Sequence, residues 1–164
     1  MSGEFQDHQI RDKIDINYKY TMGGQSKFFI ELMNNIKILG TKCKICGKVW
    51  MPPRINCSDC YEDTDWIEIN QTGTIQVSTI VWYTTSAFIQ AVPYGIAFIK
   101  LDGTHTAFNQ GIFSENLVPS KVKKGQRVRA VFLKEREGKM TDFFFVPESE
   151  YERWINKPEY EGGV

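Results

Sequence analysis

The chain has 164 residues, with 20 basic and 20 acidic side chains and an isoelectric point near 6.7. This length suits one main domain with appendages, and the balanced charge disfavours a protein that lives mainly on DNA phosphates. No apolar run approaches the roughly 20 residues of a membrane-spanning helix, and the polar amino terminus lacks the apolar segment of a secretory signal. We therefore expect a cytoplasmic protein with reduced cysteines and no membrane partner.

Residues 1–40 are predicted to form an arm and one helix. The arm is polar but carries an alternating apolar series, typical of a strand that lies along a neighbouring surface: Ile14, Ile16, Tyr18 and Tyr20. Ser26 is a suitable N-cap for a helix that runs to about Leu39, with Gly40 at the C′ position. An apolar stripe for packing follows the helical period through Phe29, Leu32, Met33 and Ile36.

Residues 41–64 contain every cysteine of the chain, in the segment KCKICGKVWMPPRINCSDC. Two Cys-x-x-Cys pairs can turn their sulfurs toward one ion and complete a tetrahedron, which predicts a structural zinc ribbon with the ligands Cys43, Cys46, Cys57 and Cys60. Iron in the same sulfur site is the rival. A catalytic zinc is disfavoured, because four protein ligands leave no open coordination position.

The residues around the ligands fit this metal site unequally. Gly47 follows Cys46 and suits the tight turn of the first knuckle, whereas Tyr61 takes the same place in the second and makes that turn less ideal. Four thiolates around Zn²⁺ leave a charge of about −2, which nearby basic side chains would offset. The candidates are Lys42, Lys44, Lys48 and Arg54.

Residues 65–146 are rich in strand patterns. We predict a long first strand over 66–83 that bends at Gly73, followed by strands at 94–101, 104–111, 126–135 and 140–147. Asp102 and Gly103 form a tight hairpin turn in this prediction. Five short strands with a break after the third indicate a Greek-key barrel of the OB type, although a five-stranded sandwich would show the same pattern. Residues 147–164 are predicted to add a final helix that ends before Pro158.

Catalysis by this chain alone has few candidate residues. With the cysteines bound to metal, the remaining acid–base candidates are Asp102, His105 and Glu115, and the other histidine, His8, lies in the arm. A lone histidine on a predicted strand is usually a packing or hydrogen-bonding residue, and Asp102 is accounted for by its place in the predicted hairpin turn. The sequence also lacks the G-x-S-x-G, P-loop and G-x-G-x-x-G motifs.

The order of these parts resembles a known family. A helix leads into the cysteine segment with Pro52, Pro53 and Arg54 between the knuckles, then into WIEINQTGTIQVSTIVW, VPYGIAFIKLDG and QRVRAVF. This series is similar to the acyl-CoA-associated zinc-ribbon/OB-fold family, long filed as a domain of unknown function, over residues 27–146. The resemblance implies a rubredoxin-like zinc ribbon followed by a five-stranded OB barrel, in a mainly β protein with an amino-terminal helix.

The resemblance also implies an accessory subunit rather than an enzyme in its own right. Members of the family accompany thiolase-like enzymes that act on β-oxoacyl-CoA thioesters, and they help to structure the complex and to bind or channel acyl-CoA. A thiolase-fold partner would supply the nucleophilic cysteine and the histidines, and this chain would be an essential subunit of a CoA-dependent acyltransferase. The aromatic content of 13% would fit an aromatic acyl group.

The basic segment SKVKKGQRVR is the candidate for binding CoA phosphates, with Lys121, Lys123, Lys124 and Arg127 as the residues involved. Strand alternation places Arg127 and Arg129 on one face. The simpler explanation of these charges is a solvated strand end. The apolar connection 84–95 is a second candidate surface, for a partner or an acyl chain.

The alternative hypothesis is a module that binds single-stranded nucleic acid. OB barrels stack bases on aromatic side chains beside a basic groove, and the aromatic candidates here are Trp82, Tyr83, Phe88, Tyr94 and Phe108. The zero net charge and the acidic segment PESEYE count against this hypothesis.

Overall fold

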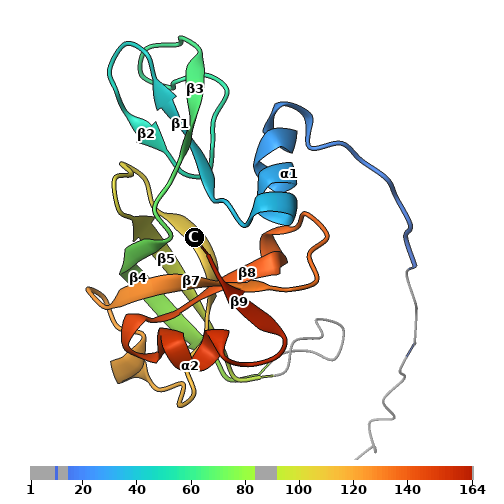
Figure 1. Ribbon diagram of the computed structural model, residues 1–164, viewed down its shortest axis with the longest axis vertical. Coiled ribbons are helices and arrows are strands. Elements are labelled where there is room, and N and C mark those ends of the chain that lie inside the picture. The colour runs from blue at the N-terminus through green and yellow to red at the C-terminus, as the bar shows by residue number, and fades with distance from the viewer. Residues whose placement is uncertain (1–9, 11–14, 84–91, 164) are drawn as a thin grey trace, which may run out of the picture.

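The computed structural model describes residue 10 and the ranges 15–83 and 92–163. Figure 1 shows three parts: a small three-stranded sheet at one end, a barrel at the other, and a helix beside the junction between them. Along the chain, the order is helix, small sheet and barrel. A second helix follows and lies at the end of the barrel away from the small sheet.

The first helix, α1 (Ser26–Asn35), follows a single 3₁₀ turn at Gly23–Gln25. It ends earlier than predicted, because Ile36 rather than Gly40 adopts the left-handed conformation after it, at φ 57°. Its buried side chains are Phe28 and Leu32. Gly40 instead lies in the next strand, where a Cβ would come within 2.7 Å of the Trp50 carbonyl oxygen. The glycine therefore serves close strand packing rather than helix termination.

The small sheet has the strand order β2–β1–β3, all antiparallel, with β1 (Leu39–Cys43) in the middle. Its neighbours are β2 (Val49–Trp50) and β3 (Thr64–Glu68). This is the predicted ribbon, but β3 was expected to open the barrel. Trp66 pairs with Thr41 of β1 instead, so the strand predicted over 66–83 is divided between two sheets.

The barrel comprises β4 (Thr72–Val81), β5 (Tyr94–Leu101), β6 (Phe108–Ile112), β7 (Arg127–Leu133) and β8 (Phe143–Pro147). They are hydrogen-bonded in the order β4–β5–β6–β8–β7, and pairing of β4 with β7 closes the ring. Only β6 and β8 run parallel to each other within this ring. Closure excludes the sandwich and confirms the five-stranded OB-type barrel.

The first barrel strand bends at a different residue from the one predicted. The register of β4 against β5 shifts between Ile75 and Val77, which marks a bulge at Gln76. Gly73 has another role, since a Cβ there would lie 2.6 Å from the Lys100 carbonyl oxygen. A glycine at this position lets the two strands approach each other.

Strand β8 is buried along its whole length, which explains its unbroken apolar sequence FFFVP. Phe143 and Phe145 face the barrel interior, whereas Phe144 and Val146 pack in a second cluster beneath α2 (Tyr151–Ile155). A short strand that was not predicted, β9 (Tyr160–Gly162), then pairs with β7. The presence of α2 confirms the predicted carboxy-terminal helix, although a 3₁₀ turn at Glu148–Glu150 precedes it.

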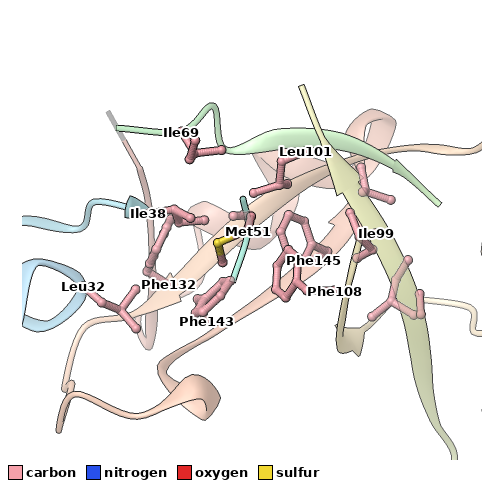
Figure 2. Close-up of a cluster of buried hydrophobic side chains, with 14 of the residues drawn as sticks. Leu32, Ile38, Met51, Ile69, Ile99, Leu101, Phe108, Phe132, Phe143 and Phe145 are labelled. Carbon is pink, nitrogen blue, oxygen red and sulfur yellow. The ribbon is translucent and has the colours of Figure 1, made fainter. Parts of the chain in front are cut away.

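One core joins the three parts of the molecule. Figure 2 shows side chains from α1, the base of the ribbon and the barrel strands in a single cluster, including Leu32, Ile38, Met51, Ile69 and Phe132. Met51 and Phe132 are fully buried although they come from the ribbon segment and from β7. Since burial of each such side chain stabilises by about 1.5–3 kcal/mol, the ribbon is anchored on the barrel by packing as well as by its own sheet.

The described part of the arm is exposed. Ile16, Tyr18 and Tyr20 face solvent, whereas Ile14 and His8 lie outside the described residues. Figure 1 shows this segment leading away from the body of the molecule beyond α1. Within the described ranges, no helix has the length and apolar character needed to cross a membrane.

Candidate metal centre and basic groove

The two knuckles of the ribbon repeat one backbone pattern. In the first, the Gly47 N–H donates to the Cys43 carbonyl at 3.1 Å, and the Cys43 N–H donates to the Lys48 carbonyl at 2.9 Å. In the second, the Tyr61 N–H donates to the Cys57 carbonyl at 2.9 Å, and the Cys57 N–H donates to the Glu62 carbonyl at 2.9 Å. Each turn thereby directs both sulfurs of its Cys-x-x-Cys pair to the same side.

The four sulfurs converge on one point. The Sγ atoms of Cys43, Cys46, Cys57 and Cys60 all lie within 4.8 Å of one another. A tetrahedral zinc with Zn–S distances of about 2.3 Å requires sulfurs about 3.8 Å apart, and Cys46 and Cys57 are separated by 3.8 Å. All four cysteines are free of disulfides. The donor set and its spacing fit a four-thiolate metal site, as the sequence predicted.

Backbone N–H groups act on the ionisation of these sulfurs, and the pKa shifts differ between the cysteines. The Ile45 N–H donates to Cys43 Sγ at 3.4 Å. The N–H groups of Asp59 and Cys60 hold the pKa of Cys57 down to about 7, against the usual value of 9.0. In contrast, hydrogen bonding with Cys46 and burial raise the pKa of Cys60 to about 12. Without a cation the four sulfurs cannot all ionise, so a bound metal is what makes the set compatible with four thiolates.

The predicted basic residues lie in the segment around the site, and two of the four, Lys44 and Lys48, also have acidic partners. Lys48 Nζ lies 2.8 Å from Asp59 Oδ2 and 4.5 Å from the centre of the Trp50 ring. Arg54 lies over the same ring at 4.6 Å, and Lys44 pairs with Asp65 at 3.3 Å. Their charge is shared between the thiolates and these acids.

His105 is a connector between ribbon and barrel. It lies before β6 rather than in it, and its Nδ1 accepts a hydrogen bond from the Val49 N–H at 3.0 Å. The His105 N–H donates to the Val49 carbonyl at 3.0 Å, and Thr106 Oγ1 both accepts from the Met51 N–H and donates to its carbonyl. An acceptor at Nδ1 places the neutral ring's proton on Nε2. This confirms the predicted hydrogen-bonding role.

The remaining acid–base candidates do not form a constellation. Asp102 accepts two hydrogen bonds from Arg127 at 2.7 and 2.6 Å and a third from Thr72 at 2.6 Å, so its pKa falls to about 2. Glu115 accepts from Arg153 at 2.9 Å. No hydrogen bond joins any two of Asp102, His105 and Glu115 in the described ranges.

The predicted CoA-binding residues fall into two groups. Lys123 and Lys124 line a groove of about 480 Å³ between β4 and the connection that precedes β7. Lys121 instead pairs with the buried Glu150 at 3.6 Å, and Arg127 is held by Asp102 and, at 3.6 Å, by Glu148. Arg127 and Arg129 do alternate with buried neighbours along β7, as predicted, and Arg129 lies over the Tyr151 ring at 4.0 Å.

A second hollow, of about 590 Å³, was not predicted. Its walls are aromatic and carry no charged side chain; they include Tyr94, Phe113, Phe144, Trp154 and Tyr160. These residues come from β5, β8, α2, β9 and the segment after β6, so no local sequence pattern brings them together. Of the predicted apolar connection, residues 84–91 lie outside the described residues; Trp82 and Tyr83, immediately before it, are exposed.

Comparison with known proteins identifies relatives across these parts. A family model described as the C-terminal OB-fold domain of ChsH2 matches residues 66–133. DUF35 domain-containing scaffold proteins of Methanocaldococcus jannaschii and Methanothermobacter thermautotrophicus are 32% and 28% identical to this chain over 102 residues. These alignments cover 61% of this chain and 70% and 74% of the two relatives.

Two solved structures share the fold. The Ltp2-ChsH2(DUF35) aldolase superposes with a TM-score of 0.57 at 19% identity, over 78% of this chain and 96% of the matched one. A DUF35 protein of unknown function from Sulfolobus solfataricus superposes with a TM-score of 0.53 at 27% identity, over 69% of this chain and 81% of the matched one. With its four-cysteine ribbon, its closed barrel and these relatives, the chain belongs to the DUF35 family.

Proposed function

We propose that this protein is a non-catalytic accessory subunit of a thiolase-type complex that acts on β-oxoacyl-CoA thioesters. One observation carries the proposal: all four cysteine sulfurs converge within 4.8 Å, and the chain has no other cysteine. A sulfur nucleophile for acyl transfer must then come from another polypeptide. The naming of curated relatives as scaffold proteins supports a structural role beside an enzyme.

We propose the identity of the partner from the sequence resemblance. The fold neighbour that contains ChsH2 is named for an aldolase formed with Ltp2, whereas the sequence resemblance points to thiolase-like partners. Both kinds of enzyme form or break carbon–carbon bonds, and we propose the thiolase because the resemblance extends through the ribbon and the barrel opening. Zinc is the proposed metal of the ribbon.

The proposed role of the ribbon is structural: it keeps the surface that faces the partner in one conformation. A zinc ion bound to four thiolates supplies structural stabilisation and has no open position for substrate. Cys43 and Cys57 are buried beneath Trp50, and the His105–Val49 hydrogen bonds fix the ribbon against the barrel. We propose that this rigid pair presents a constant surface to the partner, and that Lys121, Lys123, Lys124 and Arg127 form the basic edge near which CoA phosphates bind.

Co-purification tests the proposal. A tagged chain isolated from its native extract should retain a thiolase-fold protein in near-equal amount, and the mixture should cleave a β-oxoacyl-CoA while the lone chain does not. An aldolase-type partner would correct the partner but keep the accessory role. Thioester turnover by the isolated chain, with four metal-bound cysteines, would refute the proposal.

A further inference from the structure

The aromatic hollow beside α2 forms where the carboxy-terminal segment folds back on the barrel (Figure 1). Strand β9 pairs with β7 from Val131 to Leu133, and α2 packs over the outward side chains of β8. Residues of β5 and β6 continue the wall, and together these elements surround about 590 Å³. The hollow therefore depends on the whole carboxy-terminal segment, and its volume is that of a single small-ligand site.

The hollow is a recess with buried aromatic side chains in its wall. Phe144 and Trp154 line it but are each only 8% exposed, whereas the polar lining residues Asn109 and Thr141 are exposed. Edge-to-face contacts at 5.4 and 5.2 Å hold the Phe144 ring against Trp154 and Tyr160. Concave sites with aromatic walls and few polar groups are typical of small-molecule binding, so the shape favours an inserted ring over the face of a protein.

The charge of the walls restricts the kind of ligand. No charged side chain lines the hollow. Lys157 Nζ lies 3.5 Å from the centre of the Trp154 ring, but this lysine is not part of the wall. A carboxylate or phosphate inside the hollow would lose its hydration without gaining an ionic partner there. The walls therefore select an uncharged molecule, which separates this site from the basic edge proposed for CoA phosphates.

One polar atom of a lining residue has no partner. Among the described residues, three buried side-chain nitrogen or oxygen atoms make no hydrogen bond, and Trp154 Nε1 is one of them. Gln110, which also lines the hollow, has both ends of its amide in use: Nε2 donates to the Met140 carbonyl at 2.8 Å and Oε1 accepts from the Gly111 N–H at 2.9 Å. A buried donor without an acceptor is unfavourable, and an occupant that supplies an acceptor removes this penalty.

We infer that the hollow binds an uncharged aromatic molecule of one or two rings that carries a hydrogen-bond acceptor. Its ring packs on Phe113, Trp154 and Tyr160, and its acceptor takes the hydrogen bond of Trp154 Nε1–H. Because these contacts come from α2, β9 and the barrel, the ligand also holds the carboxy-terminal segment in place. The inference goes beyond the proposed function and does not depend on it.

Proton–nitrogen correlation spectra of the full, metal-loaded chain test the site with matched probes. Acetophenone carries both ring and acceptor, ethylbenzene has the ring alone, cyclohexyl methyl ketone has the acceptor alone, and benzoate is charged. We expect saturable binding of acetophenone that moves the Trp154 indole resonance downfield and leaves that of Trp50, a buried indole of the ribbon, in place. Ethylbenzene and the saturated ketone should each bind about fivefold more weakly, and benzoate should not bind.

Substitutions in the wall separate the hydrogen bond from the cavity. Trp154→Phe keeps a ring but removes the N–H, so acetophenone should then bind only as tightly as ethylbenzene. Gly111→Leu adds a side chain whose Cβ would lie 3.3 Å from Phe113 Cε2, which fills the hollow and should abolish binding. Thr141→Phe, at an exposed wall position, should also weaken binding, whereas Ser120→Phe, at an exposed position outside the wall, should not.

Several results would overturn the inference. They are equal affinity for acetophenone and ethylbenzene, an unshifted Trp154 resonance at saturation, unaltered binding in the filled variants that circular dichroism shows to be folded, and no saturable binding of acetophenone. Tighter binding of a synthetic peptide of residues 15–22 would also overturn it, because the hollow would then take a protein segment. Failure of the co-purification test would leave this binding unchanged, so the two proposals fail separately.

Discussion

At the residue scale, the two knuckles place different residues in the same backbone conformation. Gly47 has φ 70° and Tyr61 has φ 60°. The left-handed region costs a non-glycine residue about 1–2 kcal/mol, and the Tyr61 side chain is 85% exposed, so burial does not offset this cost. The hydrogen bond from the Tyr61 N–H to the Cys57 carbonyl holds the turn in place, and a metal bound to the four sulfurs would hold it further.

Replacing Tyr61 should therefore stabilise the chain. We expect Tyr61→Gly to raise the free energy of unfolding by up to about 1 kcal/mol, because the relieved strain exceeds the added entropy of an unfolded glycine. Gly47→Ala should lower it by about 1 kcal/mol, since its Cβ would meet nothing closer than Lys42 Cε at 3.9 Å and only the backbone conformation is strained. Urea denaturation of the zinc-loaded variants measures both; destabilisation by Tyr61→Gly would contradict this explanation.

The Asp102–Arg127 pair should make stability depend on acid pH. Because Arg127 lowers the pKa of Asp102 to about 2, from 3.8, the stabilisation is fully present above pH 4 and is lost as the pH falls toward 2. The two side chains are 39% and 43% exposed, so solvent screening limits the effect to about 1 kcal/mol. Asp102→Asn should remove this part of the pH dependence, measured by denaturation from pH 5 to 2, whereas Glu159→Gln should preserve it.

At the element scale, the segment before β6 joins the ribbon to the barrel by hydrogen bonds. Its backbone and the side chains of His105 and Thr106 satisfy the N–H groups of Val49 and Met51. Both of these residues are buried. If the contact were removed, either N–H would be left without a hydrogen-bond partner, because water could not replace the lost acceptor. The orientation of the ribbon on the barrel depends on these bonds.

Removing one of these acceptors should loosen the ribbon locally. We expect His105→Ala to lower the free energy of unfolding by about 1–2 kcal/mol, and to speed hydrogen exchange at the Val49 amide more than at barrel amides such as that of Ala130. Asn109→Ala, at an exposed position of β6, is the control for substitution nearby. Unchanged exchange at Val49 in His105→Ala would show that the bond does not hold the ribbon.

The sequence predicted those elements whose signal is local. Cysteine spacing located the knuckles, and alternation located most barrel strands. Trp66 was assigned to the wrong sheet because its strand continues almost directly into β4 and only the long-range pairing with Thr41 separates them. The predicted end of α1 is wrong because the left-handed conformation after the helix is adopted by Ile36, a β-branched residue. Glycine adopts this conformation more readily, so the pattern pointed to Gly40. Likewise, the aromatic hollow depends on α2 and β9 folding back, which no local pattern specifies.

At the scale of the whole molecule, ribbon and barrel share one core. Ile38, Met51 and Ile69 from the ribbon side belong to the same buried cluster as Ile99 and Phe145 of the barrel. A metal that stabilises the ribbon should therefore stabilise the barrel as well, since the two cannot separate without exposing this cluster. Because of this shared packing, a metal bound in the ribbon would contribute to the stability of the whole chain.

Chelation should accordingly lower the stability of the entire chain. We expect removal of the metal to reduce the midpoint of thermal unfolding by about 10 °C, in a transition that tryptophan fluorescence and far-ultraviolet circular dichroism report together. Two of the four tryptophans, Trp50 and Trp66, lie in the ribbon sheet and contribute its fluorescence, and the strand signal is dominated by the barrel. Two separate transitions, with the barrel unaffected by chelator, would show that the units are energetically independent.

The state of the four sulfurs decides whether this chain can supply a nucleophile, and titration of reactive thiols with parallel metal analysis measures that state directly. We predict one metal ion per native chain, protection of Cys43, Cys46, Cys57 and Cys60 from the thiol reagent, and release of four reactive thiols together with the metal when a strong chelator is added. Native protein that contains no metal and offers a reactive thiol, and that cleaves a thioester through it, would contradict the claim that this chain leaves the chemistry to a partner.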